Sequence, residues 1–371
     1  MQPGTLFTRS PYPIDSYDRL ANPPELIYNK TIPRKGAYSL FSGVLAQSKL
    51  RIPRERFVHP ARSRNAGIAG PFLEMGDGAA RDSNSLESRG REATLFPNGK
   101  TSGRRKIRVE SKDRLGQSTQ PIGVFDSGVG GISVLRSMRA LLPNERFIYY
   151  GDNLNAPYGT RPEEEILALT LTSVQELLAR GVKALVIACN TATSAAAQDL
   201  RAHLQLPIIG MEPALKPAAL ASGSGRILVM ATPATLRQKK FQALMRQYGD
   251  RAEMVPCPGL MEFVERGEID SPALAEYLKD RFAPFDNMAA IVLGCTHYVF
   301  LRHAIHKVMP GALLFDGNEG TARRLKDVLG AEGLLNREGP GSVEFITTGD
   351  PEVFLPIIQM LYELPPDDQG K

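Results

Sequence analysis

Two cysteines in this sequence follow short apolar runs of the same kind. Cys189 comes after the run at 184–187, and Cys295 comes after a run at 291–293 and a single glycine. Side chains with amide, hydroxyl or imidazole groups come next in both cases: Asn190 and Thr191, and Thr296 and His297. Such runs are typical of buried parallel strands, and open α/β sheets place their ligands at the carboxyl ends of strands. Two thiols there predict a site with two facing acid/base groups.

The two cysteines occupy matching places in a repeated pattern. Ile122 and Ile227 each begin a short apolar strand and lie 105 residues apart, while the cysteines lie 106 residues apart. Two nearly equal offsets indicate a duplicated unit. Strands alternate with helical patterns in both copies, which predicts an α/β fold of two pseudo-symmetric domains, each with a doubly wound parallel sheet.

The matched placement decides how the thiols are interpreted. A single buried cysteine is most often an inert, small apolar residue. A thiol before a helix N-terminus, however, has its pKa lowered from about 8.5, so that some thiolate exists at neutral pH. We therefore expect Cys189 and Cys295 to do chemistry. Cys257, in the loop sequence PCPG, has no such context and is expected to be structural.

Asp126 and Ser127 follow the first strand and precede the glycine-rich run GVGG. Asp126 either caps the next helix or acts on a neighbouring thiol or a substrate amine. The run lacks the third glycine of GxGxxG and the Lys-Ser/Thr of a P-loop, so we predict no cofactor. The glycines are expected to let backbone N–H groups approach a substrate carboxylate. The three cysteines have no metal-type spacing, so no metal is expected.

Two further residues and one pair of residues are candidates for the site, and each also has a purely structural explanation. His297, two residues after Cys295, is either a general acid/base assistant, which we favour, or a structural histidine. Glu265 lies on a helix that follows Pro258 and either serves the site or belongs to a solvated face. The pair Tyr158 and Gly159 either binds a ligand or turns the chain.

The domain organisation follows from composition and from the duplication. Residues 1–120 are rich in Pro, Gly, Ser, Arg and Asn, and are expected to be a disordered extension or sequence upstream of the natural start. A binding arm and an organelle presequence are the less favoured alternatives. We predict a first α/β domain at 121–212 and 318–371 and a second at 213–317, with the active site between the two.

Charge and hydropathy limit the binding partners and the cellular location that we expect. Residues 1–120 carry 21 Lys and Arg against 11 Asp and Glu, a net of +10, and the rest carries 24 against 29, a net of −5. Basicity therefore belongs to the extension, and nucleic-acid binding is not expected of the catalytic part. No run approaches the roughly 18 apolar residues of a membrane span. These features predict a cytoplasmic protein with free thiols.

From Ile122 to about Leu361 the chain closely resembles the bacterial glutamate racemases of the aspartate/glutamate racemase superfamily. The resemblance covers about two-thirds of the chain and none of residues 1–120. The stretches that carry it are IGVFDSGVGG, YYGDNLNAPYG, VIACNTAT, GMEPALKPA, MATPAT and VLGCTHY.

The resemblance implies cofactor-independent racemisation by two bases. Cys189 would take the proton from D-glutamate and Cys295 from L-glutamate. Asp126 would assist on the Cys189 side, and Glu265 and His297 on the Cys295 side. The positions implied to contact L- or D-glutamate are Asp126, Ser127, Tyr158, Gly159, Asn190, Thr191, Thr296 and His297. D-Glutamate would feed peptidoglycan synthesis, and a homodimer is expected.

Two departures from the family pattern stand out. The loop reads GDNLNAPYG where Thr-Ala-Arg or similar usually follows the aspartate, and Val299 stands where proline is usual. The first bears on loop conformation and substrate preference. The alternatives are a racemase of another amino acid, such as aspartate, and a non-catalytic amino-acid-binding or interaction module. The presence of both cysteines favours catalysis over the latter.

Overall fold

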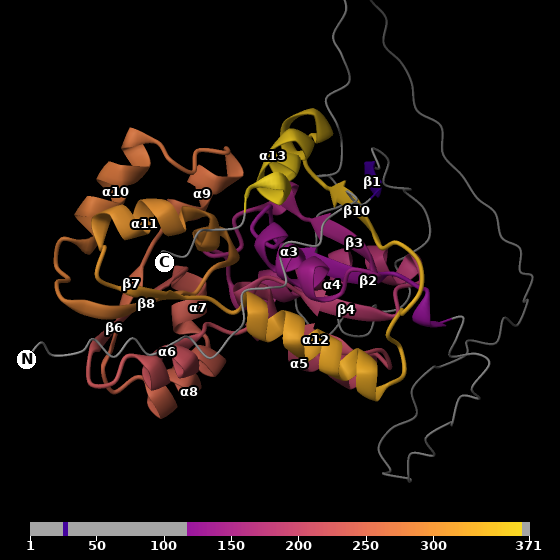
Figure 1. The fold of residues 1–371 in the computed structure, drawn as a ribbon, viewed down its shortest axis with the longest axis horizontal. Helices are drawn as coiled ribbons and strands as arrows, with labels where there is room; N and C mark the ends of the chain where they lie inside the picture. Colours follow the sequence, from indigo (N-terminus) through magenta and orange to yellow (C-terminus); the bar gives the residue numbers. More distant parts are fainter. Residues whose placement is uncertain (1–24, 29–116, 366–371) are drawn as a thin grey trace, which may run out of the picture. The chain divides into compact units, whose positions relative to one another are not determined.

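The computed structural model describes residues 25–28 and 117–365 of the chain. Strands and helices alternate from Ile122 onward, as Figure 1 shows. The strands form two sheets, and every strand pair in both is parallel. The predicted α/β fold with two parallel sheets is therefore confirmed.

The first sheet has the strand order β1-β10-β3-β2-β4-β5. Its strands are β1 (Glu25–Tyr28), β2 (Ile122–Asp126), β3 (Arg146–Gly151), β4 (Ala184–Ile187), β5 (Ile208–Gly210) and β10 (Ser342–Thr347). The helices of this half are α3 (Ile132–Leu141), η2 (Asn153–Asn155), α4 (Glu163–Ala179), α5 (Asn190–His203), α12 (Asn318–Ala331) and α13 (Pro351–Glu363).

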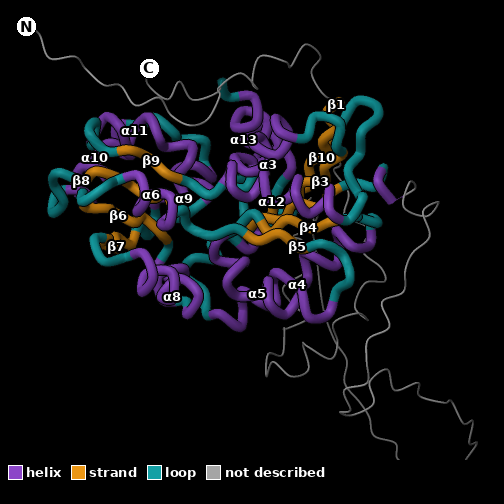
Figure 2. Tube along the Cα trace, turned by 60° about the horizontal axis from the view of Figure 1, so that its bottom comes forward, coloured by secondary structure: helices purple, strands orange, loops and turns teal. Residues whose placement is uncertain are grey.

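Both faces of this sheet are covered, because successive residues of a strand point to opposite faces. On β2, Val124 is buried in a cluster with side chains of α3 and α12, whereas Phe125 belongs to a cluster with α4 and α5. Figure 2 shows α4 and α5 on one side of β4 and β5 and α12 on the other. This explains why the strands are apolar without alternation.

The second sheet has the order β7-β6-β8-β9. Its strands are β6 (Arg226–Ala231), β7 (Ala252–Pro256), β8 (Met288–Leu293) and β9 (Leu313–Phe315). Its helices are α6 (Leu215–Ala221), α7 (Pro233–Arg237), α8 (Lys239–Tyr248), α9 (Leu260–Glu265), α10 (Pro272–Phe282), η3 (Thr296–Leu301) and α11 (Arg302–Val308). Counted from the start of each half, β3-β2-β4-β5 and β7-β6-β8-β9 have the same order: second, first, third, fourth. This shared order is what a duplicated unit produces.

The structure differs from the sequence expectation in three places. The sequence after Pro233 predicts one helix through Tyr248, but the structure breaks it at Gln238, whose backbone is extended and whose buried side chain donates to the Thr191 carbonyl. The sequence pattern predicts no element at 302–316, where the structure has helix α11 and strand β9. Before Pro121, the short strand β1 pairs with β10. Residues 1–24 and 29–116, for which disorder was predicted, lie outside the described part, and the two domain boundaries stay a prediction.

A buried ion pair closes the amino-terminal edge of the first sheet. Lys183 Nζ lies 2.5 Å from Glu145 Oε2 and also donates to the carbonyls of Ser118 and Leu334. Glu145 Oε1 accepts the N–H of Asn336. Since buried charges are stable only when paired and hydrogen-bonded, each of these partners matters to the fold.

We expect the residues just before Pro121 to contribute to the stability of the fold. A chain that begins at Gln117 keeps the Ser118 carbonyl on Lys183, whereas one that begins at Pro121 loses it. The shorter chain should lose about 1.5–3 kcal/mol of unfolding free energy, because the lost hydrogen bond is to a buried charge. Urea unfolding followed by circular dichroism measures this, and equal stability of the two chains would contradict it.

Candidate active site

Both predicted thiols lie at the carboxyl edges of their sheets. Cys189 follows β4 and caps α5, where its Sγ accepts the Ala192 N–H at 3.4 Å. Cys295 follows β8 and precedes η3. Their residues are 6% and 9% exposed, and neither forms a disulfide. Each sheet thus delivers one free, nearly buried thiol.

The surroundings of Cys189 keep it protonated. Ser127 Oγ lies 3.4 Å from its sulfur. Burial, and after it the charge of Asp126, raise the pKa of Cys189 to about 12. The helix N-terminus of α5, expected from the sequence to favour the thiolate, is outweighed here by burial. At neutral pH this side chain is an acid.

The surroundings of Cys295 are of a different kind. Its sulfur lies 3.5 Å from His297 Nδ1, and Nε2 of the same ring lies 2.7 Å from Glu265 Oε1. Burial of the ring opposes protonation, but the hydrogen bonds and charges of Cys295 and Glu265 outweigh it, so the pKa of His297 lies well above its usual range. A cation beside a sulfur stabilises negative charge on that sulfur. The structure therefore brings the predicted residues Cys295, His297 and Glu265 together in one chain of contacts.

Asp126 lies at the centre of the site and is completely buried. Its Oδ1 accepts the Gly128 N–H at 2.8 Å, and its Oδ2 accepts the Thr296 hydroxyl at 3.2 Å. Burial raises the pKa of Asp126 to about 6, against the opposing charge of His297. Helix α3 begins at Ile132, and its N-cap residue, Gly131, has no side chain to cap it; no side-chain cap hydrogen bond is present, so the capping alternative for Asp126 does not apply.

The glycine-rich run accommodates side chains from the other half of the fold. The Val129 N–H donates to Glu265 Oε1 at 2.7 Å. A Cβ on Gly128 would overlap the Glu265 carboxylate, and one on Gly130 would overlap the His297 ring. The sequence assigned these N–H groups to a substrate carboxylate, whereas the N–H of Val129 binds the carboxylate of Glu265.

A cluster of three hydroxyl groups lies beside the Cys189 loop, and two of its members, Thr232 and Thr235, were absent from the sequence-predicted site. Thr191 Oγ1 is 3.1 Å from Thr232 Oγ1 and 3.0 Å from Thr235 Oγ1, and all three residues are buried. Thr232 follows β6 as Ser127 follows β2, so the duplication offset was the signal that could have found it. The cluster joins the first half of the fold to α7 of the second.

The remaining predicted residues divide into two groups. Tyr158 donates its hydroxyl to Asp152 at 2.6 Å, and Gly159 packs against Thr232, so both hold the loop after β3 in place. Asn190, next to Cys189, is buried and its Oδ1 has no hydrogen-bond partner. A buried acceptor of this kind is costly unless a ligand satisfies it, which points to a ligand with donor groups.

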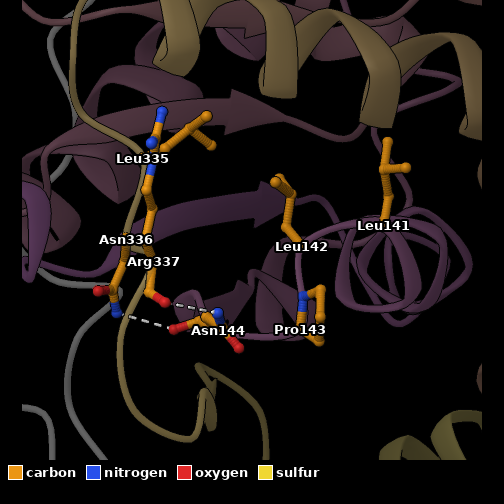
Figure 3. A pocket seen from close by; sticks show the side chains of 7 residues that line it. All are labelled: Leu141, Leu142, Pro143, Asn144, Leu335, Asn336 and Arg337. Carbon is orange, nitrogen blue, oxygen red and sulfur yellow. Dashed lines mark hydrogen bonds between the residues drawn. The ribbon is translucent and has the colours of Figure 1, made fainter. Parts of the chain in front are cut away.

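Other features lie away from these thiols. A pocket of about 210 Å³ is lined by residues 141–144 and 335–337. Figure 3 shows it with the hydrogen bonds between Asn144 and the 335–337 loop. Asn144 precedes β3, so this pocket is at the opposite end of the first sheet from Cys189. Within residues 25–28 and 117–365 no group of His, Cys, Asp and Glu is arranged to hold a metal. Nor does that part of the chain contain a helix long and apolar enough to cross a membrane.

Comparison with known proteins identifies the class to which this fold and site belong. The model of the Asp/Glu/Hydantoin racemase family matches residues 122–325. A glutamate racemase of Clostridium botulinum is 50% identical over 224 residues, which cover 59% of this chain and 87% of the relative. The fold and the relatives are those of an amino-acid racemase, an isomerase. The chain belongs to the Asp/Glu/Hydantoin racemase family.

Solved structures of similar fold belong to the same class of enzyme. Glutamate racemase from Thermus thermophilus, in complex with β-chloro-D-alanine, has a TM-score of 0.59 and 40% identity, covering 66% of this chain and 94% of its own. Glutamate racemase from Francisella tularensis, in complex with D-glutamate, has a TM-score of 0.59 and 26% identity, covering 67% of this chain and 96% of its own. These neighbours extend across both sheets.

The buried Asp126 carboxyl should make stability depend on pH. With a pKa of about 6 in the folded state and 3.8 as its ordinary value, the folded protein binds more protons than the unfolded one between these pH values. Its contribution to stability is therefore greatest at low pH and is lost as pH rises through this window. Asp126→Asn removes the buried charge.

When pH is raised from 4 to 7.5, the unfolding free energy of Asp126→Asn should increase relative to that of the parent by up to about 3 kcal/mol. Urea unfolding of both proteins at the two pH values gives the comparison. A difference between them that does not change with pH would contradict the role assigned to this carboxyl.

Proposed function

We propose that this chain interconverts L- and D-glutamate without a cofactor, with Cys189 and Cys295 as acid/base groups on opposite faces of the substrate. One observation carries the proposal: a duplicated fold supplies two nearly buried thiols at equivalent strand ends, and their neighbours differ. One thiol is held protonated beside Ser127, and the other lies against the cation of His297. We assign the first as the resting acid and the second as the resting base.

The L-to-D direction starts from the protonated Cys189 and the thiolate of Cys295. The thiolate of Cys295 takes the proton from Cα of L-glutamate, and the Cys189 thiol donates its proton to the opposite face. The α-proton of an amino acid is very weakly acidic, so the reacting atoms must be held in place and the developing charge must be stabilised by preorganised donors. His297, supported by Glu265, balances the charge at Cys295 before the transfer.

The D-to-L direction exchanges the roles. Cys189 must become the thiolate, although burial and Asp126 raise its pKa. The ammonium group of a bound amino acid offsets the negative charge of Asp126 and so favours that thiolate. Asp126 is ionised above its own pKa of about 6 and is the acceptor through which we expect the Cys189 side to lose its proton.

Substrate binding is assigned to the polar groups that surround the thiols. The unpaired Asn190 Oδ1 is suited to the ammonium group, and the hydroxyl groups of Ser127 and Thr191 are suited to the carboxylates. Thr296, whose hydroxyl donates to Asp126, is assigned to the site through that contact. The amino-acid class is supported by the family, and glutamate in particular by the relatives of known specificity. Gly159 and Tyr158 are assigned to the same site through their backbone and the loop they order.

The biological setting follows from the activity. D-Glutamate is expected to supply peptidoglycan synthesis, and the protein is expected to work in the cytoplasm as a homodimer. No cofactor is assigned, because two thiols and their partners supply both proton transfers.

The test is a chirally resolved assay in deuterated water with L- and D-glutamate and L- and D-aspartate. The thiol that reprotonates Cα has exchanged with solvent, whereas the attacking thiolate has just received the substrate hydrogen. Early product should therefore carry deuterium at Cα while the remaining substrate stays protonated. Deuterium in both enantiomers from the first turnovers would indicate a single shared base. Turnover of aspartate but not of glutamate would show that aspartate, and not glutamate, is the substrate.

Cysteine variants separate the two thiols. Cys189→Ala and Cys295→Ala each remove the acid for one direction and the base for the other, so both directions should fall by orders of magnitude. Cys257→Ala is the matched control: this thiol is buried too, but its sulfur donates to the Val255 carbonyl, so turnover should survive. Normal racemisation by either of the first two variants would refute the mechanism.

His297→Asn should affect the two directions unequally, because the imidazole touches Cys295 alone of the two thiols. Equilibrium fixes the ratio of the two kcat/KM values, so the asymmetry must appear in kcat and KM separately. We expect a greater loss of kcat for L-glutamate than for D-glutamate. Equal losses of kcat in the two directions would indicate a symmetric binding role instead.

A further inference from the structure

Asn153, in the loop after β3, contacts the site without touching either thiol. Its residue is 6% exposed, and its Nδ2 donates to Glu265 Oε2 at 2.9 Å. The other oxygen of that carboxylate is occupied by the Val129 N–H and by His297 Nε2. Asn153 is thus the donor that holds the oxygen of Glu265 facing away from the histidine.

The orientation of the Asn153 amide is itself fixed. Thr347, at the end of β10, donates its hydroxyl to Asn153 Oδ1 at 2.7 Å. With the oxygen engaged in this way, the amide nitrogen must face Glu265. Thr347 is buried, and its hydroxyl oxygen accepts the Gly349 N–H at 3.1 Å, so it is tied to the backbone as well.

These contacts form one path from the sheet to the thiol. Thr347 orients Asn153, Asn153 and Val129 hold the two oxygens of Glu265, and Glu265 contacts the ring that lies beside Cys295. We propose that Asn153 is a positioning residue that aims the Glu265 carboxylate at His297 and so governs the base on the Cys295 side. The proposal rests on the proposed function for its kinetic consequences, but not for its structural ones.

Loss of the Asn153 amide should leave Glu265 free to turn away from the ring. The titratable groups that face His297 are Glu265 on α9, Cys295 on its own segment and Asp126 at the end of β2. With Glu265 no longer aimed, the ring loses a stabilising partner for its cation, so its pKa should fall. If the Asn153 donor only weakened the charge of a carboxylate that stays in place, the pKa of His297 would instead rise on its removal.

The first measurement is an NMR titration of the His297 ring in the full chain, assigned with His297→Asn; the sequence has only five histidines. Asn153→Ala should lower the pKa of His297 by about half a unit or more. Thr347→Val, which removes only the hydroxyl that orients the amide, should lower it less. An unchanged or raised value in Asn153→Ala overturns the proposal. This readout does not need turnover.

The second measurement is the pH dependence of glutamate racemisation. Asn153→Ala should lower kcat/KM about ten-fold, as expected for a lost hydrogen bond to a charged group. The alkaline limb of kcat/KM should move to lower pH, because the protonated ring is required. No turnover by the parent chain would refute the proposed function alone, since the titration would still decide the role of Asn153.

Asn155→Ala is the matched control. Asn155 lies in the same short helix η2, two residues after Asn153. Its side-chain amide donates to the Asp152 carboxylate and not to Glu265. A loop-wide disturbance should appear in both variants, whereas the change at His297 should appear only in Asn153→Ala. An alkaline limb that moves equally in both variants would overturn the specific role.

Discussion

The site depends on the contacts of the Glu265 carboxylate. Glu265 is the last residue of α9 in the second half of the fold. Its carboxylate binds the Val129 N–H in the first half and the His297 ring beside Cys295. This approach is possible only because Gly128 and Gly130 have no Cβ. Without this contact the ring would lose its anionic partner, and the link between the strand end of β2 and the thiol after β8 would be gone.

The two thiols are equivalent by topology but not by chemistry. Duplication places both at the end of the third strand of their halves. Their neighbours have diverged: a serine hydroxyl and a buried carboxyl lie beside Cys189, and an imidazole lies beside Cys295. Two identical side chains therefore have chemically different neighbours in the same structure. A reaction that needs an acid on one face and a base on the other requires such a difference.

The sequence was sufficient for the fold because its signals are local and repeated. Apolar runs, glycine-rich turns and a constant offset predict parallel strands and their duplication. The apolar runs located the thiols and placed Asp126 at a strand end, and the offset showed that the two thiols are equivalent. It could not show that Val129 binds Glu265 or that Asn153 joins them, because those contacts connect residues 112 to 136 positions apart. Nor could it show the break at Gln238, where a tertiary hydrogen bond overrides a helical pattern.

The distribution of buried polar groups explains how such a site is tolerated. Asp126 is fully buried with a raised pKa, and Asn190 Oδ1 is buried without a partner. Both destabilise the fold, as is common where function rather than stability selects the residue. The amino-terminal edge of the same sheet carries the opposite arrangement, since the Lys183–Glu145 pair is satisfied by backbone groups of Ser118, Leu334 and Asn336, which belong to two segments. The buried charges at one end of the sheet are thus satisfied by the fold itself, whereas the other end keeps a buried acceptor that the fold leaves unpaired.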